Sequence, residues 1–319
     1  MLHVLLLIVS AGAIYLACEQ FVNAVEHLGR LLRVGTLAVG TVLAAVGTAL
    51  PESVVTGVAV TVGHAKDIGV GAAMGGPLAL STLAYAVVGI SLLLRRQSLP
   101  AIDAGRLGRD QTAFLGIFAL KVTLGLVAFA WKPWLGLLFF AAYAVYVVVE
   151  LRADDDTEPD DLEPLTLGRS NTPGLTPVLL QTLATLVVIF LASQVFVAQL
   201  TWTGPQLGLS PSVTALLLAP VATELPEVMN ALIWVRQGKT QLALSNISGS
   251  MMVQATVPSG LGILFTSWEF DGPLLLSGLV TATAIAFLLA ILRRGRMSAR
   301  ALAAAGVFYL GFAAVLPFV

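Results

Sequence analysis

Charged side chains are scarce in this chain of 319 residues, of which only 11% are Asp, Glu, Lys or Arg and 57% are hydrophobic. Soluble domains average about 25% charged residues. The scarcity therefore excludes an ordinary soluble domain and predicts an integral membrane protein. The net charge of −1 says nothing about partners, because the charges are sharply segregated along the chain.

Cysteine is nearly absent as well. The single residue, Cys18, cannot form an intrachain disulfide and carries no metal-binding signature. The chain also lacks a nucleophile–histidine arrangement and a cofactor motif, so we expect neither an enzyme nor a bound cofactor. A basic leader segment and a cleavage site are missing after Met1, so we interpret the first apolar run as a spanning helix.

What the chain does have is long apolar runs, each near the roughly 20 residues that a helix needs to cross a bilayer. Their approximate limits are 3–25, 36–62, 68–94, 112–130, 133–151, 176–200, 211–236, 241–267, 272–292 and 300–318. The runs do not alternate in polarity as the strands of a membrane barrel do. We therefore predict an all-α membrane protein with ten transmembrane helices.

The loops between these runs are strongly asymmetric in positive charge. Fourteen Lys and Arg residues fall on one side: Arg30, Arg33, Arg95, Arg96, Arg106, Arg109, Arg152, Arg169, Arg236, Lys239, Arg293, Arg294, Arg296 and Arg300. Only Lys66 and Lys132 fall on the other side. Because cytoplasmic loops carry the excess of positive charge, the first side is predicted to be cytoplasmic. Both termini then lie outside, and we expect a prokaryotic cell membrane.

The chain consists of two related halves. An offset of 175 residues aligns Glu52 with Glu227 and Thr48 with Thr223. We divide the chain into a first five-helix repeat (1–151), an acidic cytoplasmic linker (152–173) and a second five-helix repeat (174–319). Because five is odd, the second repeat enters from the opposite side, as in the inverted repeats of many transporters. The linker is interpreted as a solvated segment, or else as a surface that concentrates divalent cations.

Each half contains a Thr-x-x-Pro-Glu motif inside an apolar run. The motifs read Gly47-Thr48-Ala49-Leu50-Pro51-Glu52 and Ala222-Thr223-Glu224-Leu225-Pro226-Glu227. A proline in a helix breaks it and frees the carbonyl four residues earlier, and a buried carboxylate is costly. One such motif would often be a kinked helix with an interhelical hydrogen bond, but two symmetry-related copies favour an ion site.

The chemistry of the motifs is that of oxygen ligands. Glu52 and Glu227 supply carboxylates, and Thr48 and Thr223 lie four residues earlier on the same helix faces. Carboxylates, hydroxyls and freed carbonyls suit Ca²⁺, Na⁺ or a proton and suit soft metals poorly. Two close carboxylates also repel each other unless a cation or proton lies between them.

The eighth run adds a polar stripe, Asn246, Ser250 and Gln254, spaced four residues apart. We predict that these side chains face the glutamates, although small and polar residues also join helices by close packing. The third run has no ligand oxygens at the equivalent side chains. Those residues are Ala72, Gly76 and Leu80.

Other polar residues inside the runs are less specific. Glu224 either adds a third acid to the site or points away into water. Glu19 and its counterpart Gln194 either line an access path or cap the first helix of each half. Lys121 is expected to reach the membrane surface or to pair with an acid.

At these motifs the chain resembles the calcium/cation antiporter superfamily, which includes the sodium/calcium exchangers. That family carries a Gly-Thr-Ser-x-Pro-Glu motif and then a Gly-Asn-x-x-Gly-Ser motif in each half. Residues 47–52 and 222–227 match the first motif, with substitutions at Ala49, Ala222 and Glu224. Residues 245–250 match the second motif closely, whereas residues 71–76 match it only in their glycines.

The resemblance implies an alternating-access antiporter that moves Ca²⁺ against Na⁺ or H⁺. It also implies that Glu52 and Glu227 are the central calcium ligands, and that Ser250 binds a flanking sodium ion. The departures at Gly76, Leu80 and Gln254 predict damaged sodium sites and make coupling to protons more attractive.

Three alternatives stay open: an exchanger of monovalent cations and protons, a transporter of Mn²⁺ or Mg²⁺, and a sensor that binds ions without transport. The expected partners are inorganic cations and the lipid bilayer, and no nucleic acid. The eight candidate ligands are Thr48, Glu52, Thr223, Glu224, Glu227, Asn246, Ser250 and Gln254.

Overall fold

The computed structural model describes residues 2–61, 66–153, 162–206, 208 and 217–319. Within these ranges the chain forms helices and no β-strand, which confirms the all-α prediction. One isolated antiparallel bridge joins Leu165 and Ser170 in the connection between the halves.

The described part of the first half contains ten helical elements, of which η1 and η2 are π-helical and η3 is a 3-10 helix. They are α1 (Leu2–Leu32), α2 (Thr36–Ala38), η1 (Val39–Ala44), α3 (Ala45–Thr61), α4 (Lys66–Ala79), η2 (Leu80–Ala84), α5 (Tyr85–Leu94), α6 (Ala104–Leu126), η3 (Lys132–Leu135) and α7 (Gly136–Arg152). Several elements follow one another without a loop, so that α2, η1 and α3 form one continuous helical segment.

The described part of the second half continues with seven elements. They are α8 (Leu175–Gln206), α10 (Ala219–Thr223), α11 (Leu225–Arg236), α12 (Thr240–Phe265), α13 (Gly272–Arg293), α14 (Ala299–Val315) and the 3-10 turn η5 (Leu316–Phe318).

Six helices in the described ranges are long and apolar enough to cross a membrane. They are Leu2–Leu32, Gly69–Leu94, Lys132–Arg152, Leu175–Gln206, Gly272–Arg293 and Ala299–Phe318. The other predicted spans fall on helices that are interrupted, as at α10 and α11, or that carry polar residues, as in α6 and α12. Ten crossings and an inverted repeat therefore stay predictions.

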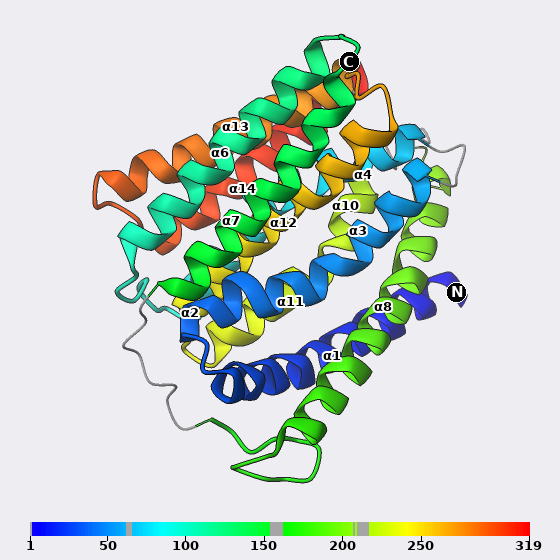
Figure 1. The fold of residues 1–319 in the computed structure, drawn as a ribbon. Coiled ribbons are helices and arrows are strands. Elements are labelled where there is room, and N and C mark those ends of the chain that lie inside the picture. The colour runs from blue at the N-terminus through cyan, green and yellow to red at the C-terminus, as the bar shows by residue number, and fades with distance from the viewer. Residues whose placement is uncertain (1, 62–65, 154–161, 207, 209–216) are drawn as a thin grey trace.

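Helix α12 lies in the middle of the bundle, in contact with α3, α4, α6, α7 and α11 (Figure 1). Most of its residues are buried, polar ones included. A helix that is buried on every side belongs to the core of the protein. The polar stripe of α12 is therefore shielded from lipid.

Helices α1 and α8 pack against each other at one edge of the molecule (Figure 1). Many of their large apolar side chains are exposed, among them Leu5, Ile8, Leu180 and Leu191. Exposed leucines and isoleucines in such numbers suit a lipid-facing pair of helices.

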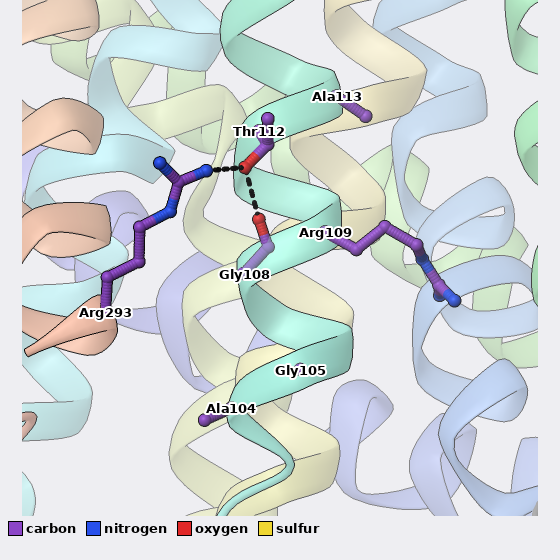
Figure 2. Close-up of a pocket in the computed structure, with 7 residues that line it drawn as sticks. All are labelled: Ala104, Gly105, Gly108, Arg109, Thr112, Ala113 and Arg293. Carbon is purple, nitrogen blue, oxygen red and sulfur yellow. Dashed lines mark hydrogen bonds between the residues drawn. The ribbon is translucent and has the colours of Figure 1, made fainter. Parts of the chain in front are cut away.

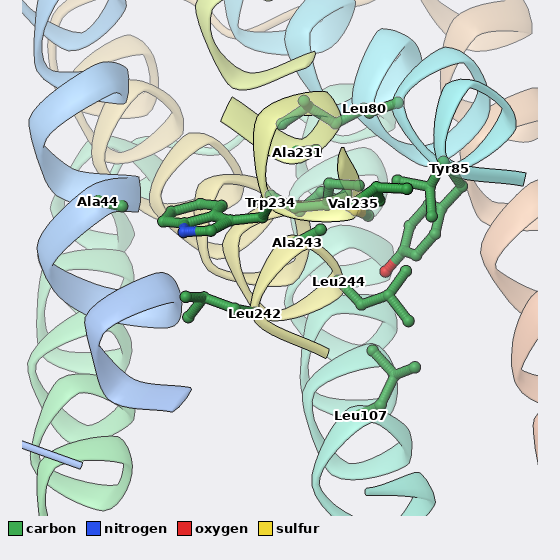
Figure 3. Close-up of a cluster of buried hydrophobic side chains, with 14 of the residues drawn as sticks. Ala44, Leu80, Tyr85, Leu107, Ala231, Trp234, Val235, Leu242, Ala243 and Leu244 are labelled. Atoms are coloured by element: carbon green, nitrogen blue, oxygen red, sulfur yellow. The ribbon is translucent and has the colours of Figure 1, made fainter. Parts of the chain in front are cut away.

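A cluster of buried apolar side chains fixes α11 and α12 against α5 and α6 (Figure 3). Trp234 is completely buried in it, and its indole N–H donates to the Glu26 carboxylate at 2.8 Å. Glu26 also forms an ion pair with Lys239 at 2.6 Å, so that α1 is joined to the start of α12. The cluster thereby fixes the helix that carries Glu227 relative to the one that carries Asn246.

The end of the linker contacts the first helix of each half. The ring of His27 in α1 lies 2.9 Å from the Glu163 carbonyl oxygen, and the Leu167 N–H donates to Gln181 Oε1 in α8 at 2.7 Å. Most of the predicted acidic run, Asp154, Asp155, Asp156, Glu158, Asp160 and Asp161, lies outside the described residues.

Candidate cation site

The carboxylates of the two motifs come together although they are far apart in the sequence. Glu52 lies in α3 and Glu227 in the first turn of α11. The carboxylate of Glu52 interacts electrostatically with those of Glu227 and Glu224. Glu227 is completely buried, Glu224 is 1% exposed and Glu52 is partly buried. Three acidic side chains therefore share one interior region.

The prolines of the two motifs act differently on their helices. Glu224 lies in a turn between α10 and α11, and Pro226 follows in the first turn of α11, where a helix needs no N–H. In the first half α3 continues through Pro51 without a break. The prediction that the proline breaks the helix is therefore right only for the second half. A second proline, Pro220 at the start of α10, helps to explain the shorter segments there.

Several buried oxygens and nitrogens of the motif glutamates, of α11 and of α12 have no hydrogen-bond partner among the described residues. They are Glu52 Oε2, both carboxylate oxygens of Glu227, both amide atoms of Asn230 and Asn246, Ser250 Oγ and Gln254 Oε1. Buried polar groups are nearly always paired, because each unpaired one costs about 1–3 kcal/mol. Such a concentration of unpaired oxygens is what a bound cation or ordered water would satisfy.

The hydroxyl groups of the two motif threonines donate to backbone carbonyls. Thr48 lies beside Glu227 but directs its proton to the Ala44 carbonyl at 3.1 Å. Thr223 donates to the Pro220 carbonyl at 3.3 Å and also lies 3.4 Å from Glu224 Oε1. A hydroxyl oxygen whose proton is directed away keeps its lone pairs available for a cation.

Glu224 points into the protein and not into water. Its Oε2 accepts a hydrogen bond of 2.6 Å from the Gln254 amide, so α12 holds the third carboxylate in place. Gly76 of α4 lies directly beside this pair. A Cβ atom at Gly76 would collide with Gln254 Oε1 and lie 2.8 Å from Glu224 Oε1. The two side chains thus fill the space that a side chain at position 76 would need.

A cavity of about 120 Å³ adjoins these groups and is larger than the roughly 30 Å³ that one water occupies. Its lining includes Glu52, Thr223, Glu224 and Gln254, all predicted from the sequence. The lining also includes Gln194, as the predicted access path requires, whereas its counterpart Glu19 is exposed.

Three further polar residues were not predicted from the sequence. Thr56 and Ser193 line the cavity, and Asn230 is completely buried, each with an unpaired side-chain atom. Thr56 follows Glu52 by four residues and Asn230 follows Glu227 by three. Residues three and four positions after a glutamate share its helix face, as the threonines four positions before it do, so this spacing could have identified Thr56 and Asn230.

The prediction for Lys121 is wrong in both of its forms. Its side chain is completely buried, so it does not reach the membrane surface, and no ion pair joins it to a described acid. The ammonium group instead donates to the Ala73 carbonyl at 2.9 Å and to Ser259 Oγ at 3.2 Å.

A second hollow, of about 580 Å³, lies between α6 and α13 (Figure 2). Arg293 donates there to Thr112 at 3.0 Å, and Arg109 forms an ion pair with Glu150. The charged groups among its described lining residues are guanidinium groups, which repel cations. The hollow beside Glu52 is therefore the better candidate for a cation site.

No three His, Cys, Asp or Glu side chains in the described ranges converge as a closed metal cluster. The donors that line the cavity are mixed instead: carboxylates of Glu52 and Glu224, the amide of Gln254 in α12 and the hydroxyl of Thr223 at the end of α10. Oxygen donors of this kind suit hard cations that exchange readily, and suit tightly held soft metals poorly.

Comparisons with known proteins agree with this geometry. The family model described as sodium/calcium exchanger protein matches residues 2–152 and 177–318. CaxA of Alkalimonas amylolytica, which carries the provisional name of an antiporter, is 26% identical over 286 residues, 88% of this chain and 87% of CaxA. The inner membrane protein YrbG of Escherichia coli K12 is 25% identical over 272 residues, 83% of this chain and 81% of YrbG.

A solved structure of the sodium-calcium exchanger NCX_Mj shares the fold. It superposes with a TM-score of 0.77 and covers 99% of each chain, at 18% sequence identity.

Proposed function

Because the chain belongs to the sodium/calcium exchanger protein family, we propose that it exchanges Ca²⁺ for Na⁺ or H⁺ across the membrane by alternating access. It is a multi-pass membrane protein of a family of cation exchangers, so its substrates are inorganic cations. The observation that carries the proposal is the set of buried, unpaired oxygens that both motifs contribute to one region.

The proposed ligands are the eight residues of the motifs and of the polar stripe: Thr48, Glu52, Thr223, Glu224, Glu227, Asn246, Ser250 and Gln254. Glu52 and Glu227 are proposed as the central ligands, because the carboxylates interact and both retain unpaired oxygens. Repulsion between such carboxylates falls when a divalent cation or protons bind, which favours exchange between these ions.

The proposed architecture has ten membrane-crossing helices arranged as two inverted repeats, residues 1–151 and 174–319, joined by the linker 152–173. Both termini would lie outside a prokaryotic cell membrane. The excess of arginine in the loops on one side supports this orientation. Contributions of α3 and α11 to one region support a site at the interface of the repeats.

A second candidate is an exchanger of monovalent cations and protons, or of Mn²⁺ or Mg²⁺. The arrangement at Gly76 supports this candidate, because Gln254 and Glu224 fill the space that a ligand side chain at position 76 would need. A sensor that binds ions without transport is the third candidate.

An ion panel in liposomes tests the proposal. Purified protein is reconstituted into vesicles loaded with Ca²⁺, Mn²⁺ or Mg²⁺, and an external Na⁺ or pH gradient is then applied. We expect Ca²⁺ efflux that depends on one of the gradients and is absent from protein-free vesicles. Binding of Ca²⁺ without any gradient-driven flux would favour the sensor, and flux of monovalent ions alone would favour the second candidate.

A further inference from the structure

Lys121 is a buried lysine next to the candidate site. It lies in α6 and is 0% exposed, with its ammonium group 4.6 Å from the centre of the Phe118 ring. The two oxygens that it contacts belong to Ala73 in α4 and Ser259 in α12. Ala73 lines the same cavity as Glu52 and Glu224. The ammonium therefore contacts the backbone carbonyl of a residue that lines the cavity.

Prolines explain the polar partners of this lysine. Ala73 precedes Pro77 by four residues within α4, so its carbonyl has lost the helical N–H and receives the Lys121 ammonium instead. Gln254 precedes Pro258 by four residues within α12, and its carbonyl accepts from Ser259 Oγ at 3.3 Å. A short chain of hydrogen bonds thus runs from Lys121 through Ser259 to Gln254.

The helices nearest to Lys121 either contain no acidic residue or carry one several residues away along the helix axis. Helices α12 and α13, which pack against α6, contain no Asp or Glu within Thr240–Phe265 and Gly272–Arg293. In α6 itself the acidic residue is Asp110, which lies about 16 Å from Lys121 along the helix axis at 1.5 Å per residue. In α4 it is Asp67, about 9 Å from Ala73 by the same measure.

A buried ammonium needs compensating negative charge, because taking an isolated charge out of water is very unfavourable. The carboxylates of the cation cavity are the ones in the interior that lack cationic partners among the described residues: Glu52, Glu224 and Glu227. With all three carboxylates ionised and Lys121 protonated, the four groups together carry a charge of −2, and not −3.

We propose that Lys121 is a fixed cation that takes the place of one transported ion, so that one divalent cation exchanges for two monovalent cations without net charge movement. The inference rests on the proposed exchange function and specifies its stoichiometry. One Ca²⁺ or two monovalent ions each neutralise a cavity charge of −2. Without the lysine, neutralisation of three carboxylates would require a third monovalent ion.

The response of the calcium distribution to voltage tests this proposal. Vesicles contain the same Na⁺ concentration and pH on both sides, and an inward thiocyanate gradient sets an inside-negative potential without any cation gradient. An exchanger that moves one net charge per Ca²⁺ shifts the equilibrium calcium ratio about 50-fold per 100 mV. We expect no shift for the wild type and a shift approaching that value for Lys121→Gln.

Two further variants serve as controls. Lys132 is also a buried lysine whose ammonium donates to carbonyls, those of Leu124, Val127 and Trp268, but it contacts neither Ala73 nor Ser259. Lys132→Gln and the charge-conserving Lys121→Arg are both expected to stay insensitive to voltage. Size-exclusion profiles identify any variant that does not fold.

The outcomes separate this inference from the function on which it rests. Wild-type vesicles without Ca²⁺ flux under any gradient would remove the proposed function. Wild-type flux that responds to voltage would overturn the role of Lys121, even if Lys121→Gln fails to fold. A folded Lys121→Gln variant that exchanges Ca²⁺ independently of voltage would overturn it equally.

Discussion

Gly76 determines how the acids of the second half fit against the first half. Because it has no side chain, Gln254 and Glu224 can approach the α4 backbone and stay hydrogen bonded to each other. Gly75 serves a similar purpose, since a Cβ there would lie 3.2 Å from Pro220 Cβ. Gly71 differs, because no described atom lies within 4 Å of such a Cβ.

The substitution Gly76→Ala should therefore weaken binding of the transported cation by displacing Glu224 and Gln254. Where the usual overpacking cost of about 1–3 kcal/mol falls on the ion-bound state, it corresponds to about a 5- to 150-fold loss of affinity. Isothermal titration with Ca²⁺ measures the change. Gly71→Ala on the same helix is the matched control, and equal effects of the two substitutions would contradict the account.

The sequence alone could predict the motif residues but not how the side chains pair. Glu52 and Glu227 stand out because a glutamate after a proline in an apolar run is costly and occurs twice. The direction of Glu224 depends on the turn between α10 and α11, and the partners of Lys121 depend on a carbonyl that Pro77 frees in another helix. Both are tertiary contacts without a local signal.

Among the elements, the π-helix η1 and the core helix α12 approach each other closely. A Cβ at Gly249 would collide with the carbonyl oxygen of Thr41 and lie 2.6 Å from its Cα. The Thr41 hydroxyl in turn donates to the buried Glu150 carboxylate at 3.0 Å. Close approach at Gly249 thus connects the ligand-bearing helix to a charge network that includes Arg106.

We expect Gly249→Ala to destabilise the protein by about 1–3 kcal/mol, because backbone atoms cannot rotate away as a side chain can. Thermal unfolding of the purified protein, followed by tryptophan fluorescence, measures the effect. Gly116→Ala in α6 should be near neutral, since no described atom lies within 4 Å of its Cβ position. A Gly249→Ala variant as stable as the wild type would show that the two helices have room to separate.

At the scale of the molecule, much of the helix pattern was predictable from hydrophobic runs of bilayer length. Helices occur at the predicted positions, but α1 and α8 extend further than the apolar runs 3–25 and 176–200. The extensions include polar residues such as His27, which contacts the linker, and Thr203, whose hydroxyl donates to the Gln199 carbonyl of its own helix. Hydropathy marks the part of a helix within lipid, and not where the helix ends.

Labelling of single cysteines tests the orientation of the whole molecule. Glu269 and Arg296 are exposed residues at opposite ends of α13, and the native Cys18 is buried. A membrane-impermeant maleimide should label Glu269→Cys in intact cells, whereas Arg296→Cys should react only after permeabilisation. The reverse pattern would invert the proposed orientation, and labelling from the same side would show that α13 does not cross.

Equilibrium binding of radioactive Ca²⁺ to the purified protein tests whether the two motifs, one from each half, form a single cation site. We expect one tightly bound ion per chain and its complete loss in Glu52→Gln and in Glu227→Gln alike, with folding verified by size exclusion. Two ions per chain, or half of the binding surviving in either variant, would mean that the motifs form separate sites.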